Sequence, residues 1–360
     1  MIAVLLPAVC LLASAAAAQP VWSPERFWSQ KSEYAGSGAC RQCHGDVYRK
    51  QEASHHARSL RPLAEVTEFT RGLPFAMRDR VGEADLSLDL GPSRSVVLTA
   101  KRGSEQAELR LDWAFGAGGK AVTPLGTNRD GRYVEGRVSW YQGTGTFDLT
   151  PGARERTPKT ADQALGQVLA EEDRAKCFGC HTSRSGAPDV PPPRSEMGIR
   201  CERCHGPGGE HVRAAAAGDR RIFHPRSLDG FQMAQMCGVC HGRPPSETDF
   251  AEIARIQERQ LTVRFPSQRL VLSRCFNETD GGLKCTACHD PHSNVPVSQS
   301  LRDAPCQSCH SRQQRRDAAV CPKATEGCSV CHMPRKRVVL HSEFSDHWIR
   351  VVRSAAGATR

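Results

Sequence analysis

Residues 201–211 read CERCHGPGGEH, and the first five of them form the pattern Cys-x-x-Cys-His. This pattern occurs seven times between residues 40 and 332, at irregular intervals. The copies account for 14 of the 17 cysteines in a chain of 360 residues, so cysteine usage is organised around this motif. The copies begin at Cys40, Cys177, Cys201, Cys237, Cys285, Cys306 and Cys328.

The spacing within the motif suits covalent attachment of haem. Two cysteines three residues apart on one helical turn can form thioethers with the vinyl groups on one edge of the ring, and the next histidine then lies under the iron. We therefore predict seven covalently bound haem c groups. The predicted attachment residues are Cys40, Cys43, Cys177, Cys180, Cys201, Cys204, Cys237, Cys240, Cys285, Cys288, Cys306, Cys309, Cys328 and Cys331. The predicted proximal ligands are His44, His181, His205, His241, His289, His310 and His332.

Zinc is the alternative cofactor for paired cysteines. Two Cys-x-x-Cys pairs can form a tetrahedral site with four sulfur ligands. A zinc site of this kind does not require a histidine after every second cysteine, whereas all seven pairs have one. The pattern therefore favours haem over zinc.

The N-terminal segment 1–18 is uncharged and apolar, and it ends in Ala16-Ala17-Ala18. Small residues after an apolar run are typical of a cleaved signal peptide, although no basic residue precedes the run. An uncleaved anchor is the alternative, and membrane contact is expected only in that case. We expect a periplasmic or otherwise exported protein.

The rest of the chain divides by composition. We expect a first haem-binding segment over 19–60, a β-rich haem-free insert over 61–170, a six-haem domain over 171–350 and a disordered tail over 351–360. Alternating patterns predict strands over 84–90, 95–100, 106–115 and 132–141, and helices are expected over 171–177 and 250–260. The predicted fold is mostly α and irregular, with short helices wrapped around stacked haems and a small antiparallel β insert.

Seven of the 14 histidines lie outside the motifs, one for each predicted iron. This match predicts mostly bis-histidine haems, a ligation that favours electron transfer because no coordination position is vacant. His292 lies three residues after His289, too close to reach the far face of the same iron, so it should serve a neighbouring haem. His211, six residues after His205, invites the same argument.

The other candidates differ in context. His55 and His56 are adjacent on an expected helix and face different directions, so only one of them is expected to bind iron, and His56 is preferred. His224 precedes Pro225 in a loop, where it could be a ligand or an ordinary surface residue. His341 and His347 follow the last motif and complete the candidate distal ligands.

Two cysteines of the C-terminal half, Cys275 and Cys321, belong to no motif. In an oxidising compartment they could form a disulfide that braces the stretch between them. Two buried free thiols are the alternative.

At this point the sequence resembles the bacterial multihaem cytochromes that are related to the tetrahaem cytochrome of nitrifiers, to hydroxylamine oxidoreductase and to cytochrome c nitrite reductase. The resemblance rests on the ordered combination of CRQCH with SHHARSL, and on four later stretches. These are VSWYQGTGTFDLTPG at 138–152, GIRCERCHGPGGEHV at 198–212, GGLKCTACHDPHS at 281–293 and CSVCHMP with HSEFSDHWIRV at 328–351.

The resemblance implies roles for several residues. His56, His211, His292, His341 and His347 match distal-ligand positions, and Cys275 and Cys321 match extra cysteines of the family. His224 matches a less uniform position. No Cys-x-x-Cys-Lys motif is present, which argues against a nitrite reductase.

We therefore expect a protein that carries electrons between redox partner proteins. One alternative is an oxidoreductase that acts on a small nitrogen or sulfur compound at a five-coordinate haem, with Trp113, Tyr133, Trp140 and Tyr141 as possible pocket walls. Another is a haem-bearing scaffold subunit of a larger complex. The net charge of +10 does not predict a nucleic-acid partner, because the haem propionates would offset it. The oligomeric state is left open.

Overall fold

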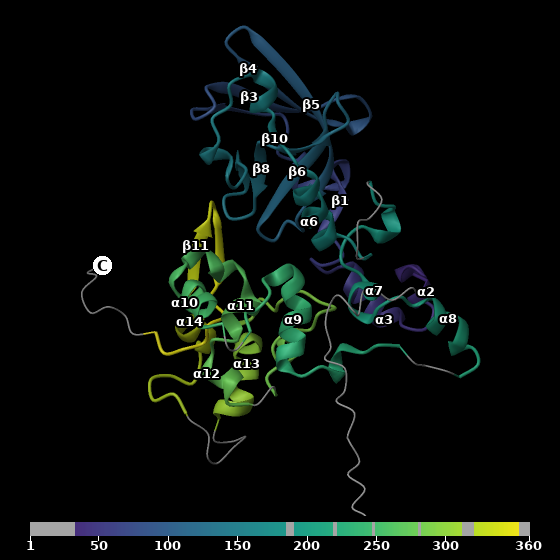
Figure 1. Ribbon diagram of the computed structural model, residues 1–360, viewed down its shortest axis with the longest axis vertical. Coiled ribbons are helices and arrows are strands. Elements are labelled where there is room, and N and C mark those ends of the chain that lie inside the picture. The colour runs from purple at the N-terminus through teal and green to yellow at the C-terminus, as the bar shows by residue number, and fades with distance from the viewer. Residues whose placement is uncertain are drawn as a thin grey trace, which may run out of the picture.

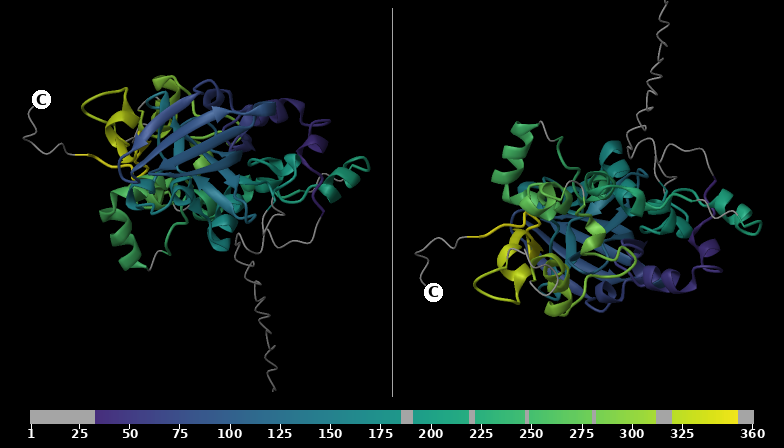
Figure 2. Two further views of the ribbon diagram at one scale, coloured as in Figure 1. Left: turned by 90° about the horizontal axis from the view of Figure 1, so that it is seen from above. Right: turned by 90° about the horizontal axis from the view of Figure 1, so that it is seen from below.

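The computed structural model describes residues 33–184, 191–218, 222–246, 249–279, 282–311 and 320–352. The predicted signal peptide and nearly all of the predicted tail lie outside the described residues. A β-sheet forms one half of the structure, and the helical segments that carry the motifs form the other half (Figure 1). Seen along the perpendicular direction, these helical segments extend beyond the sheet on both sides (Figure 2).

The sheet has ten strands, and all of its pairings are antiparallel. Its main path runs β10-β7-β6-β5-β4-β3-β2, while β1 pairs with β5, and β8 pairs with β6 and β9. The strands are β1 Leu60–Pro62, β2 Phe75–Asp79, β3 Ala84–Leu90, β4 Val96–Arg102, β5 Glu105–Phe115, β6 Ala121–Thr127, β7 Tyr133–Gly136, β8 Val138–Tyr141, β9 Thr146–Leu149 and β10 Gly166–Val168.

Alternation of apolar and polar residues explains the central strands. In β3, β4 and β5 the apolar side chains point to one face, where Leu88 lies opposite Leu98 and Leu98 lies opposite Leu109. All three are almost fully buried. Together with the short helices of this half they belong to one core of 23 buried apolar residues. The sheet and the short helices packed on it therefore form one hydrophobic core.

The expectation of a mostly α and irregular fold with a small β insert is wrong, because a large curled antiparallel sheet accounts for one half of the structure. The predicted strand over 132–141 is two strands, β7 and β8. Strand β6 escaped prediction because it contains Pro124 and Gly126, two residues that normally argue against a strand interior. Central strands β3 and β5 were predicted from their alternation.

The motif-bearing half consists of short helices, one hairpin and connecting loops. Helix α9, Gly230–His241, begins with a reciprocal capping box formed by Asp229 and Gln232. The longer helices are α3 Gly45–Glu52, α6 Glu171–His181, α8 Gly209–Ala215, α9 Gly230–His241, α10 Phe250–Glu258 and α13 Gln299–His310. The shorter ones are α2 Ser37–Cys40, α4 Thr67–Thr70, α5 Ala161–Ala164, α7 Cys201–His205, α11 Pro266–Leu270, α12 Arg274–Asn277 and α14 Cys328–His332, of which α4 and α5 pack on the sheet. The hairpin is β11 Arg335–Val339 and β12 Ser342–Ser345.

Buried apolar residues are sparse in this half. Its own cluster consists of Leu228, Met233 and Met236, against which cysteines of three motifs pack. Within the ranges that the structure describes, no helix is long and apolar enough to cross a membrane.

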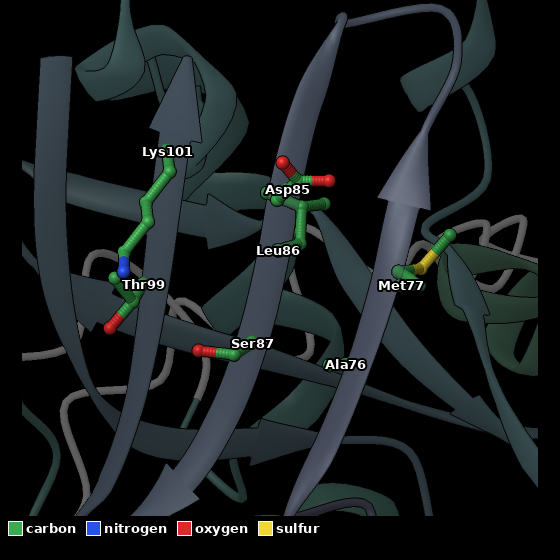
Figure 3. Close-up of a pocket in the computed structure, with 7 residues that line it drawn as sticks. All are labelled: Ala76, Met77, Asp85, Leu86, Ser87, Thr99 and Lys101. Atoms are coloured by element: carbon green, nitrogen blue, oxygen red, sulfur yellow. The ribbon is translucent and has the colours of Figure 1, made fainter. Parts of the chain in front are cut away.

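A shallow depression of about 430 Å³ lies on strands β2, β3 and β4 (Figure 3). Its lining contains neither cysteine nor histidine, the residue types of the predicted haem sites. The lining residues are Ala76, Met77, Asp85, Leu86, Ser87, Thr99 and Lys101.

Candidate haem-binding sites

Most of the motifs lie at the C-terminal ends of helices. Helices α6, α7, α9, α13 and α14 each end at the histidine of a motif. Residues three apart on a helix lie on the same side, so the two cysteines of each motif point in one direction. The remaining two motifs begin at the last residue of α2 and in the 3-10 helix Cys285–Ala287. The local backbone therefore presents both sulfurs and the following imidazole together.

Four proximal histidines each face a second histidine at a similar separation. Because a metal–imidazole bond is about 2 Å long and the ring centre lies about 1 Å beyond the nitrogen, rings on opposite sides of one metal ion have centres about 6 Å apart. The four observed separations fit an iron between the rings. The ring-centre distances are 6.5 Å for His44 and His211, 6.3 Å for His205 and His292, 6.0 Å for His241 and His56, and 6.2 Å for His289 and His347.

Backbone carbonyl groups hold several of these rings in one tautomer. A carbonyl oxygen can only accept a hydrogen bond, so a ring nitrogen beside it must carry the proton, and the other nitrogen keeps its lone pair for a metal. Nδ1 is the nitrogen so engaged in His56, His181, His205, His332 and His347, with Nδ1–O distances between 2.8 and 3.3 Å. In His292 the acceptor is the Asp290 carboxylate, 3.0 Å from Nδ1. Nε2 is therefore available to iron in all six.

Burial favours the neutral, iron-binding form of five of the candidate ligands. Removal from water lowers the pKa of His241 to about 4 and that of His347 to about 4. The same desolvation lowers the pKa of His181, His205 and His289 below the ordinary value. Protons therefore compete weakly with a metal at these nitrogens.

Cysteines of different motifs lie side by side. The thiols of Cys40 and Cys201 are close enough to share a hydrogen bond, which lowers the pKa of Cys201 to about 6. A matching contact from Cys180 lowers the pKa of Cys240 to about 6. Two further thiol pairs are Cys237 with Cys285 and Cys306 with Cys328. The edges at which separate haems would attach are therefore adjacent.

Three candidate histidines have surroundings of another kind. Nδ1 of His224 accepts a hydrogen bond from the backbone N–H of Arg226, at 3.1 Å, so the proton of the neutral ring is on Nε2. Nε2 of His341 lies 2.7 Å from a carboxylate oxygen of Asp148. His55, the neighbour of the preferred His56, lies with its ring against Gly119. None of these rings is arranged like the four that face a proximal histidine, although His224 does contact His205 edge-on.

For His181 and His332, two of the three remaining proximal histidines, no second imidazole is seen in ring contact among the described residues. The ring of His181 meets Phe115 edge-on at 5.0 Å, and Nδ1 of His332 donates to the carbonyl oxygen of Arg350 at 3.0 Å. Of the aromatic side chains considered as pocket walls, Trp113 and Tyr133 pack in the cluster around Phe178, next to this motif. The other two, Trp140 and Tyr141, are buried within the sheet.

Cys275 and Cys321 are both free thiols in the structure. Burial raises the pKa of Cys275, and the nearby thiol of Cys309 also raises it. Cys321 is exposed, and backbone N–H groups lower the pKa of its thiol. The candidate disulfide between Cys275 and Cys321 is not formed here.

Within the described ranges, no group of three or more histidine, cysteine or acidic side chains converges as a metal cluster would require. The cysteine pairs therefore do not assemble a four-sulfur zinc site in this part of the chain. Pairs of imidazoles about 6 Å apart, with two cysteines beside each proximal ring, fit haem instead.

Sequence reasoning missed the buried ion pair that lies next to the candidate ligand His347. Arg269 binds Asp346 through two hydrogen bonds of 2.9 and 2.8 Å, and both side chains are buried. Asp346 directly precedes His347 and also accepts from the backbone N–H of Trp348. The sequence does show an acidic residue, Asp346, directly before His347. It does not show the partner of this residue, because Arg269 lies 77 residues earlier.

Comparisons with known proteins agree with this geometry. A family model described as cytochrome c554 and c-prime matches residues 146–206. The multihaem cytochrome MtrA of Shewanella baltica is 22% identical over 198 residues, which cover 49% of this chain and 52% of the relative. The chain thus spans about half the length of that curated relative.

A solved structure, the outer cell wall cytochrome OcwA, aligns with a TM-score of 0.49 and 16% identity over 89% of this chain and 80% of that one. These comparisons do not test the finer resemblance to hydroxylamine oxidoreductase and nitrite reductase. The chain is thus similar to multihaem cytochromes, in agreement with its seven motifs and its paired imidazoles.

Proposed function

We propose that the protein holds seven haem c groups, mostly with two histidine ligands, and carries electrons between redox partner proteins on the outer side of the cytoplasmic membrane. The observation that carries this proposal is the set of four histidine pairs with ring centres 6.0 to 6.5 Å apart. When bound, haem iron supplies one-electron redox chemistry. Two imidazole ligands leave it no vacant position, which favours electron transfer over substrate binding.

The distal ligands tie the motifs to one another. His211 follows His205 by six residues but faces His44, the proximal histidine of the first motif. His292 follows His289 by three residues but faces His205. Each short segment therefore contributes a ligand to two different irons. The first, third and fifth motifs are linked in this way into one series.

Cysteine contacts extend the series to the other motifs. The fourth motif touches the second through Cys240 and Cys180, and the fifth through Cys237 and Cys285. The fifth and sixth are neighbours, since the thiol of Cys309 is among the groups that raise the pKa of Cys288. Cys306 and Cys328 join the sixth to the seventh. These contacts support one continuous path from the N-terminal motif to the C-terminal motif, with the second motif as a branch.

The location follows from the sequence. Residues 1–18 have the features of an export signal, and covalent attachment of the cofactor suits a protein that matures outside the cytoplasm. The partners would be other redox proteins that meet the ends of the series through small, transient contacts.

Iron ligation is tested by spectroscopy on the mature protein. We expect His211→Ala and His292→Ala each to convert one haem from low spin to high spin, measured by electron paramagnetic resonance and magnetic circular dichroism. His224→Ala is the matched control, because its Nδ1 accepts a backbone hydrogen bond, and it should leave the low-spin fraction unchanged. Unchanged spectra for both His211→Ala and His292→Ala would refute bis-histidine ligation.

A second function is favoured by one observation at the second motif. Among the described residues, no second imidazole is in ring contact with His181, and its ring meets Phe115. An iron bound by His181 alone could bind a small nitrogen or sulfur compound, as an oxidoreductase requires. Carbon monoxide binding by the reduced protein at one equivalent, lost on removal of the second motif's haem, would support this function. No carbon monoxide binding would exclude it.

A further inference from the structure

The C-terminal hairpin reaches from the seventh-motif region to the sheet (Figure 1). β11 and β12 follow α14 directly and project toward β8 (Figure 1). The hairpin thereby separates two predicted iron ligands, His332 before it and His347 after it. Its turn is formed by Leu340 and His341.

The turn is bound to the sheet by His341. Nε2 of His341 lies 2.7 Å from Oδ2 of Asp148, a residue of β9. The ring also meets the buried ring of Tyr141 edge-on, with centres 5.1 Å apart. Its backbone approaches the sheet just as closely, because a Cβ atom added at Gly143 would lie 2.5 Å from the carbonyl oxygen of His341.

A second contact supports the same junction. Nζ of Lys120 donates a hydrogen bond of 2.6 Å to the carbonyl oxygen of Glu343, and it lies over the ring of Phe344 at 5.3 Å. Lys120 comes from the loop before β6, so the hairpin is bonded both to this loop and to β9.

The chemistry of the His341 ring differs from that of the ligand histidines. A carboxylate can only accept, so Nε2 of His341 carries the proton and donates to Asp148. In the six histidines described above Nδ1 is the engaged nitrogen, and Nε2 is left for iron. His341 also has a positive φ of 53°, an unfavourable conformation for a residue with a side chain, which persists where surrounding contacts hold it.

The environment of Asp148 favours the ionised carboxylate. Burial opposes ionisation, but the hydrogen bond from His341 and a backbone N–H bond hold the pKa of Asp148 below its ordinary value. Arg154 adds a positive charge 3.3 Å from the same carboxylate. Asp148 is therefore a suitable fixed acceptor for an imidazole N–H.

We infer that His341 is a docking residue that fastens the C-terminal hairpin to the β-sheet, and that it is not an axial ligand of haem. Its role is to hold the two segments that flank the hairpin, and with them His332 and His347, in place against the sheet. This inference rests on the proposed function, because it assigns His341 relative to the haem ligands.

The test uses the fully matured protein and two readouts. The first is the low-spin haem fraction by magnetic circular dichroism, and the second is the hydrogen-exchange rate of residues 335–345. His341→Ala and Asp148→Ala should each speed exchange in the hairpin by roughly ten- to hundredfold, as expected for loss of a hydrogen bond to a charged group, and leave the low-spin fraction unchanged. His341→Gln, which keeps an N–H donor, should restore part of the protection.

The outcomes separate docking from ligation. If His341→Ala and His341→Gln both convert one haem to high spin while Asp148→Ala does not, His341 is a ligand and the inference is wrong. Unchanged hairpin exchange in both alanine variants would also overturn it. His292→Ala is the control for the proposed function: if it leaves all haems low spin, bis-histidine ligation fails there, whatever the hairpin does.

Discussion

The sheet half and the motif half of this chain differ in the size of their hydrophobic cores. The sheet buries 23 apolar side chains in one cluster, whereas the cluster of the motif half has three, with cysteines packed against it. Burial of apolar area is the main favourable contribution to folding, so the core of the sheet can stabilise this half without a cofactor. The motif half instead has histidine rings in pairs with centres 6.0 to 6.5 Å apart and thiols of different motifs in contact, the groups that would hold cofactors. One half is therefore built on side chains and the other on bound groups.

The two halves also share one device, a buried arginine–aspartate pair. In the sheet, Arg137 binds Asp79, and in the motif half Arg269 binds Asp346. The pairs differ in what stands beside them. Asp79 ends a strand of the sheet, whereas Asp346 precedes His347, which faces a proximal histidine.

The largest effect is expected when the protein is made without haem attachment. The motif half should then lose its structure, while residues 60–168 keep theirs, because the sheet core needs no cofactor. Hydrogen exchange followed by mass spectrometry should show strong protection confined to the sheet. Equal protection in both halves of the unmatured chain would break the distinction.

Removal of the acidic partner from each buried ion pair should have different effects in the two halves. Asp79→Ala and Asp346→Ala each leave a buried arginine unpaired, at a cost of about 3–5 kcal/mol to the half concerned. Only Asp346→Ala should also displace His347 and convert one haem to high spin, which denaturant unfolding combined with magnetic circular dichroism would detect. A spectral change of equal size in Asp79→Ala would show that the halves are not independent.

A cavity in the sheet core should affect the sheet alone. Leu98 is fully buried between strands, so Leu98→Ala should lower the free energy of unfolding by about 2–5 kcal/mol. Urea unfolding followed by far-ultraviolet circular dichroism measures the loss, and Leu90→Ala, at an exposed end of β3, is the control with little effect. Haem absorption should be the same in both variants.

The smallest effect is expected at the surface of the motif half. Arg274 pairs with Glu278 on α12, but its side chain is 87% exposed. Arg274→Ala should change stability by no more than the scatter of a thermal unfolding measurement and leave the haem spectrum unaltered. A larger loss in thermal unfolding would mean that contacts other than the cofactors and buried pairs support this half.

A feature could be predicted from the sequence where its signal lies within a few neighbouring residues. The motifs are five residues long, so they could be found without the fold. The strand over 84–90 was also predicted, since its alternation is contained in the strand. Strand β6 was missed because its proline and glycine are tolerated only through its pairing with β5 and β7.

Ligand pairing depends on contacts between distant residues. His56 faces His241 across 185 positions of sequence, and the two histidines share no local pattern. The same limit applies to His341, which looks like a ligand beside the last motif but is held by Asp148, 193 residues earlier. A histidine can be counted from sequence, but the nitrogen that it leaves free is set by partners elsewhere in the fold.

The central claim is that each of the seven motifs holds one haem by two sulfurs and one imidazole. Intact-mass spectrometry of the matured protein, combined with a pyridine haemochrome assay, counts the attached groups directly. The account predicts the mass of the mature chain plus seven haems and seven equivalents in the assay. Fewer than seven haems on fully matured protein, or a colourless chain that retains zinc, would contradict it.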